Sequence, residues 1–343
     1  MRYPWVNTVL LVLLLVQLVT GVGGLVSGAE DFGWVLWLHG IGGYAIVVLL
    51  IWKGAVILHA WVRRRRPVLP RAIFIALTVL VLAILATGWM WVVAGRTNVW
   101  GFSLITIHAI LACACVGLLA WHTLYMRFVF RIPSAVNRRA FLRLAGAGVS
   151  GVLLWRLGES TVERVALPGS RRRFTGSYET GSFTGVFPVT AWLLDNPPSV
   201  DVHHWRLIVD GFVERTLALT YAQLEPLAHE EVTATLDCTG GWYTTQVWRG
   251  ISIAQLLNLA GVQPAARSVT VEAATGYGRR FSIEQARGYV LASHVAGRPL
   301  DHGHGFPLRL VAVDHRGFDW VKWVSRVRVN DTSEVWQPPV PLQ

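Results

Sequence analysis

Four histidines lie inside long apolar runs, where an ionisable side chain is costly and therefore suggests a function. His39 and His59 share one run, and His108 and His122 share another. Because helical residues advance by about 100° each, the spacing puts His108 and His122 on one helix face but His39 and His59 on nearly opposite faces. Paired imidazoles are usual axial ligands of haem b. We therefore predict a haem between His39 and His108. A second haem at His122 and His59 stays open, since both could simply cap helix ends.

A single cysteine, Cys238, stands in the polar C-terminal half, after a β-rich run and before a glycine turn. Cys113 and Cys115 lie in an apolar run, so the polar half cannot close an internal disulfide. A thiolate at Cys238 could bind a soft metal, although a lone cysteine is more often a small buried hydrophobe. Considered alone, Cys238 leaves both interpretations open.

Three segments around and after this cysteine occur in an order that carries a resemblance. They are Thr233-Ala234-Thr235-Leu236-Asp237-Cys238, His304-Gly305-Phe306-Pro307-Leu308-Arg309-Leu310 and Val321-Lys322-Trp323-Val324, with a weaker fourth match at Phe187-Pro188-Val189-Thr190. Together they resemble the sulfite-oxidase family of molybdopterin enzymes, over essentially all of Phe187–Val329.

The resemblance implies a molybdenum cofactor, with the metal on a dithiolene pterin and on the Cys238 thiolate, which makes Cys238 the catalytic residue. Arg309 and Lys322 match the positions that supply a planar donor fork and a compact cation to the pterin phosphate. The other implied cofactor contacts are His304 as a donor to the pterin or its phosphate, Gly305 for close backbone approach, and Phe187 and Thr190 in the first pterin loop. Asp301 and His302 are interpreted as turn residues.

The residues after the cysteine depart from the family pattern. Sulfite oxidases carry arginines there that help bind the anionic substrate, whereas Gly240-Gly241-Trp242-Tyr243 follow here. Sulfite is therefore disfavoured as the small-molecule substrate. The aromatic side chains Trp242, Tyr243 and Trp248 suit a neutral or sulfoxide-like substrate, and aromatic core packing explains them about equally well. The resemblance implies oxygen-atom transfer as the reaction class.

Four apolar runs are long enough to cross a bilayer as helices. They extend roughly over Val9–Val26, Trp34–Val62, Ala72–Ala94 and Leu104–Phe130. Arginines gather at 63–66 and 127–143, which the positive-inside rule assigns to the cytoplasm. Asn137–Arg143 resembles a twin-arginine export signal, and the mildly apolar run to Trp155 predicts an uncleaved fifth crossing. The alternative is a cytoplasmic anchor before an ordinary fifth helix.

From about Arg171 the sequence changes to short alternating runs typical of strands. Examples are Trp205–Val209, Ser268–Val271 and Arg309–Val313, with helical signals at Tyr221–Leu227 and Ile253–Ala260. We therefore predict an all-α four-helix transmembrane domain over 1–130, a fifth segment and linker over 131–170, and a mostly β, α+β molybdopterin domain over 171–343.

The composition supports a membrane protein: 53% of the residues are hydrophobic, 17 are Trp, and the mean hydropathy is +0.45. The net charge of +11 gathers beside the apolar runs, so nucleic-acid binding is not expected. The leading hypothesis is an oxidoreductase anchored in a bacterial cell membrane, with its catalytic domain on the extracytoplasmic side. Electrons would pass between quinone, one or two haems and molybdenum. The alternatives are a non-haem anchor with a soluble electron partner, and a cofactor-free binding module.

Overall fold

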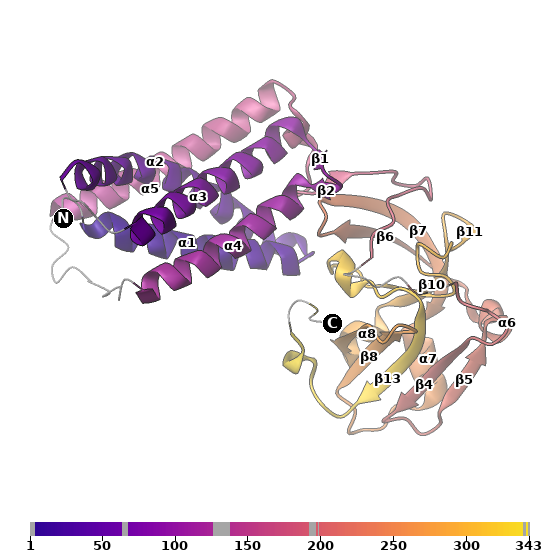
Figure 1. Cartoon of the computed structure of the whole chain (residues 1–343). Helices are drawn as coiled ribbons and strands as arrows, with labels where there is room; N and C mark the ends of the chain where they lie inside the picture. The colour runs from indigo at the N-terminus through magenta and orange to yellow at the C-terminus, as the bar shows by residue number, and fades with distance from the viewer. Residues whose placement is uncertain are drawn as a thin grey trace. The chain divides into compact units, whose positions relative to one another are not determined.

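The computed structural model describes residues 4–63, 68–125, 138–191, 197, 199–338 and 341, without the side chains of 4–5, 55–63, 68–71, 125, 139 and 140. The chain separates into two compact units (Figure 1). We call residues 1–25 and 30–178 the helical unit, and residues 26–29 and 179–343 the sheet unit.

Four long apolar helices make up most of the helical unit and lie side by side in Figure 1. They are α1 (Pro4–Val26), α2 (Gly33–Arg63), α3 (Val68–Ala94) and α4 (Leu104–Tyr125). Each contains a segment long and apolar enough to cross a membrane, namely Val6–Val26, Glu30–Gly54, Ala72–Ala94 and Leu104–Leu124. The four predicted helices are therefore confirmed, as far as the described residues extend. A turn η1 (Glu30–Phe32) precedes α2, and a hairpin of β1 (Asn98–Val99) and β2 (Phe102–Ser103) precedes α4.

A fifth helix, α5 (Arg138–Arg164), begins in the twin-arginine segment and continues without a break. It packs on α2, where a Cβ at Gly151 would lie 3.0 Å from that of Ala45. Charged residues occupy its last turns, and α5 is not among the helices apolar enough to span a membrane. The fifth crossing stays a prediction, and Asn137 lies outside the described residues. The turn η2 (Pro168–Arg171) follows.

The sheet unit contains two sheets that share one hydrophobic core. The first runs β11 (Arg298–Pro299), β10 (Val290–Val295), β7 (Trp242–Ser252), β3 (Tyr178–Glu179), with β6 (Glu230–Cys238) paired to β7 and β12 (Arg309–Val311) to β10. The second runs β5 (Leu217–Thr220), β4 (Arg206–Gly211), β13 (Val324–Asn330), β8 (Ser268–Ala273), β9 (Gly278–Ser282). The short helices are α6 (Tyr221–Leu224), α7 (Ile253–Ala260) and α8 (Ile283–Arg287), with 3₁₀ turns η3 (Glu225–Leu227), η4 (Gly317–Asp319) and η5 (Glu334–Trp336). The predicted α+β character of this part is confirmed.

The hairpin of β6 and β7 positions the cysteine. Cys238 is the last residue of β6 and pairs with Trp242, the first residue of β7. Gly241 turns the chain between them with a φ of +86°, a conformation that favours glycine. Alternate β7 side chains enter the core, where Trp248 is fully buried. Cys238 is thus held at the end of a paired strand.

Candidate functional site

Among the described residues, the thiol of Cys238 has two weak polar contacts. The backbone N–H of Gly240 donates to Sγ over 3.3 Å, and Oγ1 of Thr190 lies 3.5 Å from Sγ. A Cβ at Gly317 would lie 3.2 Å from Cα of Cys238, so a larger residue there would crowd the cysteine. The side chain of Cys238 is partly exposed.

A buried ion pair lies directly behind Cys238. Nη1 of Arg316 is 2.9 Å from Oδ1 of Asp237, and the two side chains are only 3% and 1% exposed. Nη2 of Arg316 donates to the carbonyl oxygen of Cys238 over 3.3 Å. Both residues were missed by sequence reasoning, because nothing in the local pattern pairs positions this far apart. The ion pair fixes the end of β6.

Lys322 joins two of the predicted cofactor loops. Its Nζ donates to the carbonyl oxygens of Thr190 and Gly303, both over 2.6 Å. Gly305, in the second loop, has a φ of +109°, and a Cβ there would lie 3.1 Å from Cβ of Lys322. Glycine at position 305 therefore leaves room for Lys322, and the close approach of its backbone to a pterin stays a prediction.

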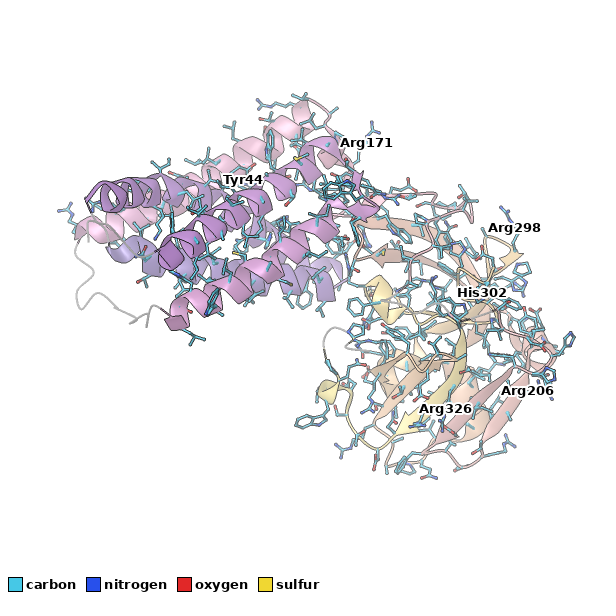
Figure 2. All side chains as sticks on the ribbon, in the orientation of Figure 1. Tyr44, Arg171, Arg206, Arg298, His302 and Arg326 are labelled. Carbon is cyan, nitrogen blue, oxygen red and sulfur yellow. The ribbon has the colours of Figure 1, made fainter. Side chains whose placement is uncertain are left out.

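His304 occupies the turn that also contains His302, which is labelled in Figure 2. Its Nδ1 lies 2.9 Å from Oδ2 of Asp301 and its Nε2 lies 3.1 Å from the carbonyl oxygen of Phe187. The rings of His304 and Phe187 are 4.0 Å apart between centroids. Burial lowers the pKa of His304 below its usual value. Both ring nitrogens thus contact protein acceptors, and Asp301, interpreted above as a turn residue, orients the ring.

Arg309 is a buried cation with an unused donor. The residue is 4% exposed, and its Nη1 donates to the carbonyl oxygen of His304 over 3.1 Å. Its Nε has no hydrogen-bond partner among the residues that the structure describes. Burial lowers the pKa of Arg309 to about 10, and the nearby Cys238 and Asp301 offset part of this shift. Leaving a charged donor buried and unpaired is costly, so the position suits a bound anion.

Two tryptophan rings flank this arginine. Cζ of Arg309 lies 5.7 Å from the ring centroid of Trp248 and 5.8 Å from that of Trp320, within cation–π range. Nε1 of Trp248 donates to the carbonyl oxygen of Ala234 over 3.1 Å. Trp248 therefore packs in the core instead of lining a substrate pocket. Trp242 is 3% exposed, and its Nε1 has no partner among the described residues.

The predicted site residues of the sheet unit form one connected set. Cys238 contacts Thr190, Thr190 contacts Lys322, and Lys322 contacts Gly305. The set continues through neighbouring backbone to His304, which contacts Phe187 and Arg309. The structure thus places together all seven residues that the sequence suggested for molybdopterin.

In the helical unit, α2 and α4 bring His39 and His108 together. Their ring centroids are 6.1 Å apart and their planes are inclined by 68°. Nδ1 of His39 lies 3.0 Å from Oγ1 of Thr20, and Nδ1 of His108 lies 3.2 Å from Oγ1 of Thr87.

The structure describes less of His122 and His59, the other two predicted haem ligands. Nδ1 of His122 is buried and has no hydrogen-bond partner among the described residues. The side chain of His59 lies outside the described residues.

Comparison with known proteins relates part of the sheet unit to a described protein family. The model of a family described as the oxidoreductase molybdopterin binding domain matches residues 194–336. The chain carries a molybdopterin-binding oxidoreductase domain. The matched residues include Cys238, His304, Arg309 and Lys322, and the match supports an oxidoreductase.

Curated relatives resemble the same part of the chain. An inducible NADH nitrate reductase of Glycine max is 27% identical, over 39% of this chain and 19% of the relative. The uncharacterized oxidoreductase YuiH of Bacillus subtilis (strain 168) is 28% identical, over 39% of this chain and 69% of the relative. The chain thus spans about a fifth of the nitrate reductase. A solved structure, the sulfane dehydrogenase SoxCD from Paracoccus pantotrophus, matches with a TM-score of 0.38 at 28% identity, covering 39% of this chain and 40% of that chain.

Proposed function

We propose that this chain is a membrane-anchored molybdenum-cofactor oxidoreductase in which Cys238 binds the metal. The observation that carries the proposal is Arg309, a buried cation near Cys238 whose Nε–H has no partner among the residues that the structure describes. A bound anionic pterin would supply the missing acceptor. The open thiol and the glycine at position 305 fit the same group.

When bound, the cofactor supplies a redox-active metal for oxygen-atom transfer to or from a small molecule. The chain's own residues hold and orient it. The N–H of Gly240 donates to the Cys238 sulfur, which helps to orient it. Lys322 fixes the Thr190 loop against the turn that ends at Gly305, and His304 fixes Phe187 to that turn. These contacts keep the two cofactor loops at a constant separation.

We also propose that His39 and His108 bind a haem b. An imidazole nitrogen lies about 2 Å from the metal that it binds, so two rings on opposite faces of one iron have centroids about 6 Å apart. The 6.1 Å separation of these rings supports such a site. Haem iron in this position would exchange electrons with membrane quinone. A second haem at His122 and His59 remains part of this proposal as an open alternative.

The proposal includes an orientation in the membrane. The arginine clusters favour a cytoplasmic location for 63–66 and 127–143, and the twin-arginine segment favours export of a folded, cofactor-loaded sheet unit. Molybdenum would then work on the extracytoplasmic side of a bacterial cell membrane. Lipid surrounds the four apolar helices in this arrangement.

Metal analysis and absorption spectroscopy of the purified full-length protein test both centres. We expect molybdenum and a dithionite-reducible b-type band in the unmodified protein. Cys238→Ser should lose molybdenum, whereas Cys113→Ser should keep it. His39→Ala and His108→Ala should lose the band, whereas the exposed His229→Ala should keep it. Molybdenum without haem would favour a simple anchor with a soluble electron partner. A molybdenum-to-protein ratio near zero would favour a binding module and overturn the proposal.

A further inference from the structure

A threonine–glycine pair lies beside each of the two imidazoles in the helical unit. Thr20 and Gly21 in α1 contact His39 of α2, and Thr87 and Gly88 in α3 contact His108 of α4. The helix pairs α1–α2 and α3–α4 therefore present the same two residue types, in the same order, to their histidines.

The two threonines determine which ring nitrogen carries the proton. Oγ1 of Thr20 donates to the carbonyl oxygen of Val16 over 2.7 Å, and Oγ1 of Thr87 donates to that of Ala83 over 2.9 Å. Each hydroxyl hydrogen is thereby used, so each hydroxyl oxygen accepts a hydrogen bond from Nδ1–H of its histidine.

A backbone carbonyl supports the same assignment for His108. Its Nδ1 also lies 3.0 Å from the carbonyl oxygen of Ile84, which can only accept. With the proton on Nδ1, the Nε2 lone pair of each ring is available, and no hydrogen bond to either Nε2 occurs among the described residues.

The two glycines restrict how the rings rotate. A Cβ at Gly21 would lie 3.3 Å from Cε1 of His39, and a Cβ at Gly88 would lie 3.2 Å from Cε1 of His108. Both distances are tighter than ordinary van der Waals contact, and both involve the same ring atom. A methyl group at either position would press on the imidazole and turn it.

We propose that Thr20-Gly21 and Thr87-Gly88 form a duplicated cradle that sets the tautomer and the ring angle of two axial metal-ligating imidazoles. The inference rests on the proposed haem site and adds its positioning residues. An acceptor on Nδ1–H raises the basicity of a ligating imidazole, which stabilises ferric over ferrous iron. The 68° inclination predicts a highly anisotropic low-spin ferric signal, as near-perpendicular imidazole planes produce.

Potentiometry of the purified full-length protein tests the threonines. Thr20→Val and Thr87→Val should keep the haem and raise its midpoint potential, and Thr20→Ser and Thr87→Ser should restore it. Thr78→Val is the matched control, because Thr78 in α3 donates to the carbonyl oxygen of Phe74 and contacts neither histidine. Potentials of Thr20→Val and Thr87→Val equal to that of Thr78→Val would overturn the proposal.

Electron paramagnetic resonance tests the glycines. Gly21→Ala and Gly88→Ala should shift the low-spin signal or lower the haem content, whereas Gly43→Ala, with open space around its Cβ, should leave both unchanged. Haem bound through His39 and His108 with signals unaffected by either substitution would overturn the cradle but keep the haem site. An unmodified protein without haem would overturn both.

Discussion

The buried ion pair behind Cys238 gives the sharpest test of how the chain holds its proposed metal ligand. Arg316 and Asp237 are 3% and 1% exposed and lie 2.9 Å apart. Removing one partner of such a pair costs about 3–5 kcal/mol, because the other charge stays buried without compensation. For Arg316→Met we therefore expect backbone amides of β6 to exchange hydrogen roughly 100-fold faster or more, since about 1.4 kcal/mol corresponds to a factor of ten.

Hydrogen exchange followed by mass spectrometry on the full-length protein measures this locally. Arg326→Met is the matched control: Arg326 pairs with Asp210 at 2.5 Å, but its side chain is 36% exposed, so we expect a smaller loss than at Arg316 and no effect on β6. The double variant Asp237→Asn with Arg316→Met should cost less than the two single changes added, because no unpaired charge remains. If β6 exchanges no faster in Arg316→Met than in Arg326→Met, the ion pair does not hold this strand.

Three further outcomes follow from the site. Gly305→Ala should destabilise the sheet unit by about 1–3 kcal/mol in thermal unfolding, more than Gly297→Ala, because both glycines have positive φ but only position 305 lacks room for a Cβ. Lys322→Met should speed hydrogen exchange around Thr190 and Gly303, and Lys322→Arg should not restore it, since the wider guanidinium cannot replace a compact ammonium between two carbonyls. The lowered pKa of His304 means that the folded state disfavours its proton. Its contribution to stability is complete above about pH 6.5 and is lost as the pH falls below that, so the melting temperature should fall more steeply on acidification than in His304→Asn.

The helices and the site residues were predictable from local patterns for different reasons. An apolar run long enough to cross a bilayer favours a helix, so the helix α4 was predictable. It begins at Leu104, as predicted. The helix Ile253–Ala260 has the predicted ends, because Ser252 caps its first turn and Gly261 follows its last. The proposed cofactor residues came from ordered motifs, which indicate neighbours in space without any knowledge of the sheet.

The partners of those residues were not predictable in this way. Arg316 contacts Asp237 only because η4 returns the chain to the end of β6, and no repeating pattern in the sequence indicates that contact. The contact of Asp301 with His304 had a weak sequence signal, because the acidic residue stands three positions before the histidine. That spacing suits a turn residue and a partner of the histidine equally well. Thr20 and Thr87 stand in apolar helices where a hydroxyl bonded to its own backbone is ordinary. Their contact with the histidines depends on how the helices pack.

The charges near Cys238 bear on the proposed substrate. An arginine beside the proposed metal ligand could replace the arginines that are missing after the cysteine, and Arg316 lies in the right place to do so. Its charge is balanced by Asp237, however, and its Nη2 donates to the backbone of Cys238. An anionic substrate would have to displace a buried ion pair, whereas a neutral one would not. The pairing of Arg316 therefore favours a neutral oxygen-atom donor or acceptor over sulfite.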